Sequence, residues 1–209
     1  MIKLKHIETT GWGPAFRGMR NPLQSHAKSD SHFENILGPN DLNLALKLIK
    51  AGASHRKFLR MINIYVDITA NLKWWDEFDT YLHTVKNSTS QMHSLLVKKF
   101  EPSDFSWKFS HPEATAIMNY IIEKLNKFRK AYLAETNKNM QKQIWRNILE
   151  LLPQSYLYTR TTMLNYEVFI TQYFNRKNHK MSEWIEYCKV LREKLPYMDE
   201  FLLALEEKG

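Results

Sequence analysis

Glycine and proline are scarce in this chain, and the scarcity narrows the folds that are open to it. Only 6 Gly and 7 Pro occur among 209 residues, which is about half of average usage. An all-β sandwich or barrel is not expected, because its many tight turns require these residues. The glycines also form neither G-x-G-x-x-G nor a P-loop motif, so the common phosphate-binding loops lack their sequence signature.

The rest of the composition is that of an ordinary globular protein. Hydrophobic residues make up 44% and charged residues 25% of the chain, both typical values. A single cysteine, Cys188, cannot form an internal disulfide and fits a reducing compartment. The first ten residues lack the apolar run of a signal peptide, and no stretch approaches 18 apolar residues. We therefore expect a cytoplasmic protein without a membrane partner.

The formal charge of +8 slightly favours an anionic partner. It is distributed as +5 over residues 1–110 and +3 over residues 111–209. The basic clusters are Lys98-Lys99 and the group Lys124, Lys127, Arg129 and Lys130. Lys and Arg in such clusters usually lie on the solvent-exposed face of a helix and bind no ligand. Nucleic acid therefore stays an alternative partner that is not favoured, since we expect no basic patch interleaved with exposed aromatic residues.

Hydropathy patterns predict an α+β fold. Alternating apolar and polar residues predict a strand over 61–69 and shorter strands over 2–7 and 156–163. Helical periodicity predicts helices over 41–51, 72–84, 92–100, 113–133, 139–152, 165–175, 180–194 and 197–207. Residues 10–40, where Gly and Pro cluster, predict a long irregular loop, and Asn87–Ser90 a polar turn. We expect one domain over 1–209, with a small antiparallel sheet packed with helices and a further helical part.

Motifs for metal or nucleophilic catalysis are weak. The eight histidines form no H-E-x-x-H, and one cysteine cannot make a zinc cluster. Asp76, Asp79, Thr80 and His83 share one predicted helical face, which fits either a carboxylate–histidine metal site or a solvated polar face. We favour the solvated face and expect no metal. Trp74-Trp75 is open to two interpretations, as a stacking surface for a base or flavin or as core.

Two stretches of the chain, 46–93 and 152–185, follow the segment order of a known enzyme family. The matching positions are Gly52, His55, Phe58, Asn87, Ser90, Leu152-Pro153, Tyr158-Thr159-Arg160, Asn165 and Arg176. In this order the chain resembles the flavin-dependent thymidylate synthases, whose signature is R-H-R-x-x-S-x-N-E-x-S-x-R-Y. Arg20 is similar to an early arginine of that family.

The resemblance implies a thymidylate-synthase-like fold and a methyltransferase reaction of nucleotide biosynthesis. Reduced FAD would pass a hydride, a methylene folate would give carbon, and dUMP would accept both in a homotetramer whose pockets are built from several subunits. On this pattern, substrate binding is assigned to Arg20, Tyr81, Asn87, Ser88, Ser90 and Arg176. Cofactor binding is assigned to His55, Arg60, His83, His93 and Asn165.

The signature itself is largely replaced. Thr80-Tyr81-Leu82 stand where the family has Arg-His-Arg, and Val85, Ser88, Met92 and His93 replace its Ser, Glu, Arg and Tyr. The resemblance gives those arginines to the flavin and nucleotide phosphates, and each such bond is worth about 1.5–3 kcal/mol. We therefore expect a divergent protein that acts on or binds a pyrimidine deoxynucleotide, or a non-catalytic binding module on the same scaffold. No catalytic residue is assigned.

Overall fold

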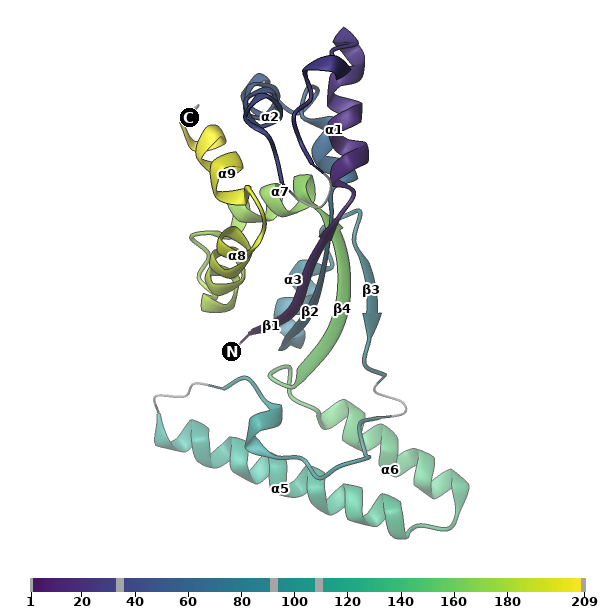
Figure 1. Ribbon diagram of the computed structural model, residues 1–209. Helices are drawn as coiled ribbons and strands as arrows, with labels where there is room; N and C mark the ends of the chain where they lie inside the picture. Colours follow the sequence, from purple (N-terminus) through teal and green to yellow (C-terminus); the bar gives the residue numbers. More distant parts are fainter. Residues whose placement is uncertain (1, 33–35, 91–93, 108–110, 208–209) are drawn as a thin grey trace.

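A four-stranded antiparallel sheet organises the computed structural model, which describes residues 2–32, 36–90, 94–107 and 111–207. The strand order is β1 (Lys3–Thr10), β2 (Asn63–Asn71), β4 (Leu157–Asn165) and β3 (Val85–Ser88), and every neighbouring pair is antiparallel. Eight α-helices accompany the sheet in the described part of the chain (Figure 1). This architecture confirms the predicted α+β class.

The central pair of strands explains why the alternation in the sequence predicts this sheet. β2 and β4 pair without interruption from Asn63 and Asn165 to Asn71 and Leu157. Ile64, Val66 and Ile68 point to one face and are fully buried, whereas the residues between them are exposed or half-buried. The apolar face must be covered, so the pattern of β2 fixes which side of the sheet the helices pack against.

Helices from distant parts of the chain cover that face. They are α3 (Leu72–Phe78), α7 (Tyr166–Arg176), α8 (Ser182–Lys194) and α9 (Met198–Glu206), on one side of the sheet in Figure 1. Trp74 and Trp75 are fully buried among them, so the core interpretation holds and the stacking-surface interpretation is wrong. Cys188 is buried there as well, and desolvation raises the pKa of its thiol to about 12.

The long loop predicted over residues 10–40 is wrong, because α1 (Trp12–Arg20) lies there, followed by two short 3₁₀ turns. Gly11 begins the helix with φ of 89°, and a Cβ at this position would lie 2.1 Å from the Met61 carbonyl oxygen. Pro14 is tolerated in the first turn, where its missing N–H needs no partner. Burial of Trp12 and Phe16 outweighs the loop-like composition. Beyond these turns, α2 (Pro39–Ala51) ends at the predicted residue, and Gly52 follows it as the C-cap.

The polar turn predicted at Asn87–Ser90 is also wrong in part. Asn87 and Ser88 lie in β3, opposite Thr161 and Arg160 of β4. The preceding helix ends at Phe78 and not at residue 84. Backbone pairing with the open edge of β4 decides the structure here, in spite of the polar composition. The predicted helix over 92–100 begins outside the described residues, and it is wrong for residues 95–100, which form turns and irregular structure.

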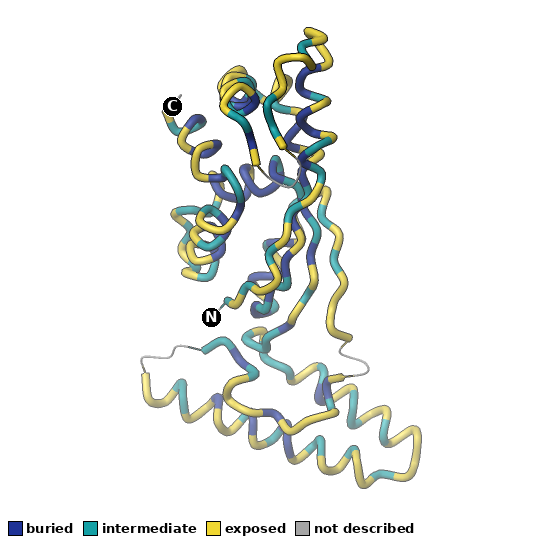
Figure 2. The backbone as a smooth tube through the Cα atoms, in the orientation of Figure 1, coloured by how far each residue is buried: buried dark blue, intermediate teal, exposed yellow. Residues whose placement is uncertain are grey.

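A helical arm, residues 94–107 and 111–152, projects from the opposite end of the sheet from α1 and α2 (Figure 1). Its two helices are α5 (Pro112–Ala134) and α6 (Lys138–Leu151), close to the predicted bounds. Much of the arm is exposed or half-buried (Figure 2). Its small core consists of Leu95, Phe100, Phe105, Met118, Ile122, Leu125 and Ile148. No helix in the described ranges is long and apolar enough to cross a membrane.

Candidate functional site

A cavity of about 490 Å³ opens where β4 meets α7. This volume lies within the range of about 300–1,000 Å³ that is common for small-molecule sites. Four of the predicted ligand residues meet here, although they come from three separate segments: Arg60, Tyr81, His83 and Asn165. Its wall is completed by Leu82, Glu167, Val168 and Thr171. The sequence interpretation assigned Tyr81 to the substrate and Arg60, His83 and Asn165 to the cofactor, and the structure brings the four residues to one cavity.

Asn165 shapes the pocket by joining the strand to the helix. It is the last residue of β4, and its Oδ1 accepts a hydrogen bond of 3.0 Å from the backbone N–H of Val168 in the first turn of α7. The backbone N–H of Tyr166 donates to the Ile62 carbonyl at 3.0 Å. The side-chain oxygen Oδ1 of Asn165 therefore caps α7 and holds the start of this helix at the pocket wall.

The pocket favours an anion. Arg60 is exposed and forms no ion pair with any described carboxylate. Glu167 is bound by Arg56 through Nε at 2.9 Å and Nη2 at 2.9 Å, so its negative charge is balanced outside the pocket. The N-terminus of α7 adds a partial positive charge on the same side. A phosphate group would therefore find one free guanidinium and a favourable helix end here.

Arg176 lies beside the pocket but is bonded within the chain. Its Nε donates to the Tyr81 hydroxyl at 2.9 Å, and its Nη1 donates to Oε2 of Glu77 at 2.6 Å. Nη1 also lies 2.9 Å from Nε2 of His179. Trp184 donates its Nε1–H to the same Glu77 oxygen at 2.9 Å, and the guanidinium lies 4.9 Å from its ring centroid. The predicted substrate residues Tyr81 and Arg176 are thus in direct contact, with the arginine charge paired.

Asp79 pairs with two further cations on this side of the sheet. It accepts hydrogen bonds from Lys86 at 2.7 Å and from Arg160 at 2.9 Å. Burial raises the pKa of Asp79, but the bonds from Lys86 and Arg160 outweigh it and hold the pKa below its usual value. Asp79 is therefore an ion-pair partner, and no group of three or more potential metal ligands exists among the described residues.

The other predicted ligand residues lie away from the cavity lining. Arg20 is only 4% exposed, and its Nε donates to Oδ1 of Asp41 at 2.6 Å. The Ser90 carbonyl accepts bonds from Ser94, and His55 is exposed with its backbone N–H on the Gly52 carbonyl. Asn87 and Ser88 are exposed on β3. His93 lies outside the described residues.

Sequence reasoning missed the partners that set the charge of the site. Glu167 and its partner Arg56 are 111 residues apart, and Glu77 and Arg176 are 99 apart. No periodicity connects such positions. Glu77 carries no local signal of its partner, because Arg176 lies in a different segment of the chain.

Comparisons in sequence find no match, either among protein-family models or among curated proteins. Comparison with solved structures does find matches. A crystal structure of thymidylate synthase X from Helicobacter pylori with FAD and dUMP aligns with a TM-score of 0.71 at 18% identity, covering 96% of this chain and 95% of that one. A second structure of the flavin-dependent enzyme ThyX from H. pylori, complexed with FAD and dUMP, gives a TM-score of 0.70 at 18% identity, covering 96% of both chains. The chain therefore has the fold of the flavin-dependent thymidylate synthases.

Proposed function

We propose that this chain binds a dUMP-like pyrimidine deoxynucleotide in the pocket between β4 and α7. The observation that carries the proposal is the meeting of Arg60, Tyr81, His83 and Asn165 in one cavity of about 490 Å³. The fold adds support, because the H. pylori proteins with this fold were solved with dUMP. We assign the protein to nucleotide metabolism on the same grounds.

Each side of the pocket suits one part of the nucleotide. Arg60 offers a free guanidinium to the phosphate, and the N-terminus of α7 favours the same negative charge. Tyr81 offers a ring on which a pyrimidine can stack, and its hydroxyl is already fixed by Arg176. His83 can donate or accept a hydrogen bond at the base or sugar. These residues bind and orient the nucleotide without requiring a metal ligand set.

FAD is harder to accommodate in a single chain. Its two phosphates require several cations, yet Thr80 and Leu82 stand at signature positions where the resemblance has arginine. Arg160 and Arg176 are bonded to carboxylates. The described residues of one chain therefore do not fit FAD, and we derive no reaction step through it. We favour nucleotide binding without turnover on this ground.

The second candidate function is the complete flavin-dependent reaction. It is favoured by the match over 96% of the chain to structures that hold both FAD and dUMP. It requires further cations at the pocket, which a homotetramer of this chain would have to supply from neighbouring copies. A folate would then be the carbon donor.

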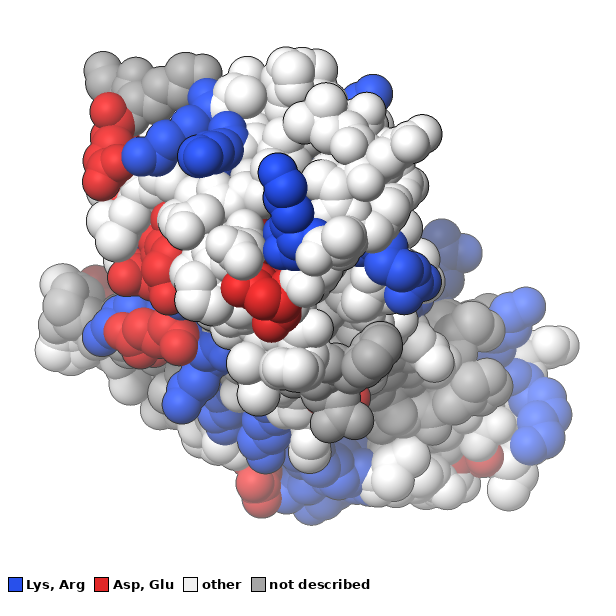
Figure 3. Space-filling model, turned by 45° about the horizontal axis from the view of Figure 1, so that its top comes forward, with Lys and Arg blue, Asp and Glu red and all other residues white. Residues whose placement is uncertain are grey.

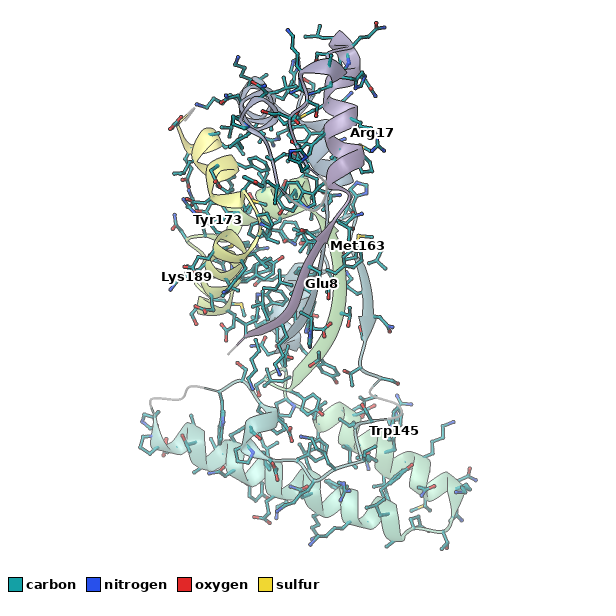
Figure 4. All side chains as sticks on the ribbon, in the orientation of Figure 1. Glu8, Arg17, Trp145, Met163, Tyr173 and Lys189 are labelled. Carbon is teal, nitrogen blue, oxygen red and sulfur yellow. The ribbon has the colours of Figure 1, made fainter. Side chains whose placement is uncertain are left out.

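Calorimetric titration of the full chain with dUMP tests the proposal, with Arg60→Ala as the critical variant. We expect saturable binding that weakens about 10- to 100-fold in Arg60→Ala, as the loss of a charge-assisted phosphate contact predicts. Arg17→Ala is the matched control, because Arg17 is exposed on α1 (Figure 4) and should leave the affinity unchanged. Absence of dUMP binding by the parent would contradict the proposal.

An absorbance spectrum and a thermal shift with FAD separate the two candidates. A colourless protein whose melting temperature FAD leaves unchanged supports binding without turnover. A yellow protein, or formation of thymidylate from dUMP, methylene folate and a reductant, supports the flavin-dependent reaction.

A further inference from the structure

The free end of the helical arm has a large net positive charge. Residues 124–146, which run from the second half of α5 into α6, contain seven Lys or Arg and one Glu, a net charge of +6 out of +8. The net charges of residues 1–110 and 111–209 do not reveal this cluster, because acidic residues elsewhere in the second half offset its charge. Figure 3 shows Lys and Arg side chains in a band along the lower edge of the molecule, where the arm lies.

Several of these cations are available to a ligand. Lys127, Lys130 and Lys142 form no ion pair with any carboxylate in the described ranges. Arg129 donates to two backbone carbonyls of the preceding loop at 2.9 and 3.0 Å, so its charge is not neutralised. Exposed ammonium groups at this density repel one another and favour a polyanion.

An aromatic pocket lies beside Lys142, whereas Lys127 and Lys130 line a separate cavity on α5. Tyr132 of α5 and Trp145 of α6 line a cavity of about 270 Å³ together with Lys138, Gln141 and Lys142. Trp145 is labelled on the arm in Figure 4. Two rings bordered by two ammonium groups can accept a flat base against an aromatic face and hold its phosphates at the rim.

A second aromatic–lysine pair lies on the outer side of α5. The Tyr120 ring is 60% exposed, and Nζ of Lys124 lies 4.6 Å from its centroid. Because the described part of the arm combines basic and accessible aromatic side chains, the expectation that they would not occur together is wrong. The surface of the arm is therefore compatible with a nucleic-acid partner.

We propose that the end of the helical arm binds single-stranded nucleic acid without sequence preference. A base stacks against Tyr132 or Trp145, and Lys142 contacts the phosphates at that pocket. Lys127 and Lys130, which line the other cavity of the arm, contact phosphates further along the strand. A single strand fits better than a duplex, because a duplex keeps its bases stacked on one another and shielded from the rings. The site is distinct from the pocket between β4 and α7 and does not depend on nucleotide binding there.

The phosphate contacts are tested by fluorescence anisotropy of a labelled oligodeoxythymidylate of about 20 nucleotides, titrated with the full chain over a series of salt concentrations. A triple variant, Lys127→Ala with Lys130→Ala and Lys142→Ala, should bind about tenfold or more weakly. Its slope of log affinity against log salt should fall by about 2, or roughly 0.7 for each lost contact.

The matched control removes the same charge from the sheet-bearing part of the chain. Lys73→Ala with Lys189→Ala and Lys194→Ala replaces three exposed lysines that form no ion pair with a described residue. We expect its affinity to stay within about threefold of the parent, since long-range attraction between exposed charges is screened. Equal losses in both triple variants, or no binding by the parent at about 50 mM salt, would overturn the proposal.

The stacking contact is tested by Trp145→Leu, which keeps an apolar side chain between the helices. We expect about fivefold weaker binding to the oligodeoxythymidylate and unchanged binding to heparin, a polyanion that has no bases. Circular dichroism establishes that the variant retains its helices. Unchanged oligonucleotide binding by the folded variant, or an equal loss toward heparin, would show that the arm attracts polyanions only through charge and would refute the stacking contact.

Discussion

The pocket and the helical arm differ in how their cations are balanced. Beside the pocket, Arg176 is bonded to Glu77 and Arg160 to Asp79. At the end of the arm, exposed lysines such as Lys127 have no described carboxylate partner. The net charge of the whole chain therefore says little about where an anion can bind. What decides it is whether each cation is already paired with a carboxylate.

Burial accounts for the difference. The described part of the sheet-bearing region buries charged side chains, as in the pair of Arg20 and Asp41, and a buried charge is tolerated only with a partner. The arm has a small core and long exposed helix faces, where a lysine remains hydrated and needs none. We expect substitutions to affect stability in the first region and ligand affinity in the second.

The largest effect is expected from Asp41→Asn, which removes the charge that balances buried Arg20. Breaking a buried pair from one side costs about 3–5 kcal/mol in free energy of unfolding, measurable by urea denaturation. Burial raises the pKa of Asp41, but bonds from Ser31, Ser29 and Arg20 outweigh it and lower the pKa. The stabilisation is therefore present above the ordinary pKa of an Asp and is lost as pH falls toward the lowered value.

Glu123→Gln in the arm is the matching control for that experiment. Its carboxylate lies 3.3 Å from Nζ of Lys124, and both side chains are exposed. Loss of such a surface pair should change the free energy of unfolding by less than about 1 kcal/mol. Similar losses in the two variants would contradict the contrast between the regions.

An intermediate effect is expected from Glu77→Gln, which leaves a cation beside the pocket without a carboxylate partner, as in the arm. The amide keeps the shape of the side chain but releases the positive charge of Arg176. We expect dUMP to bind about tenfold more tightly in calorimetry, since a charge-assisted contact to phosphate becomes possible. Asp76→Asn, on an exposed residue of the same helix, should leave the affinity unchanged. Unaltered binding in Glu77→Gln would show that Arg176 does not face the nucleotide.

The smallest effect is expected from Glu150→Gln, which removes an acidic group from the arm. Glu150 accepts a hydrogen bond of 2.8 Å from Arg146, with both side chains exposed. Release of Arg146 should strengthen oligonucleotide binding about twofold, with no measurable change in melting temperature. Weaker binding would indicate that Glu150 orients Arg146 toward the strand and does not merely neutralise it.

Local patterns predicted the parts of the fold that depend on local order. The alternation of Ile64, Val66 and Ile68 identified the central strand, and Pro112 marked the start of α5. β3 was missed because its pairing with Thr161 of β4 outweighs its polar sequence. α1 was missed because Gly11 and Pro14 are typical loop residues, although here Gly11 is the N-cap and Pro14 lies in the first turn.

The candidate site also contains residues that the sequence predicted and contacts that it did not. From the resemblance, Tyr81 was assigned to the substrate and Arg60, His83 and Asn165 to the cofactor, and the four residues line one cavity. The pairing of Glu77 with Arg176 could not be predicted, because it joins positions 99 residues apart and alters the charge of the site. The aromatic pocket of the arm was missed for a similar reason, since it forms only when α5 and α6 pack together.

Hydrogen–deuterium exchange of the full chain, with dUMP and with oligodeoxythymidylate in turn, most directly tests whether the pocket and the arm bind different ligands. We predict that dUMP slows exchange around residues 57–63, 79–84 and 165–171, and that the oligonucleotide slows it over residues 124–146. The two sets should not overlap, and each ligand should leave the other set unchanged. Protection of the same residues by both ligands, or protection of the pocket by the oligonucleotide, would contradict the account.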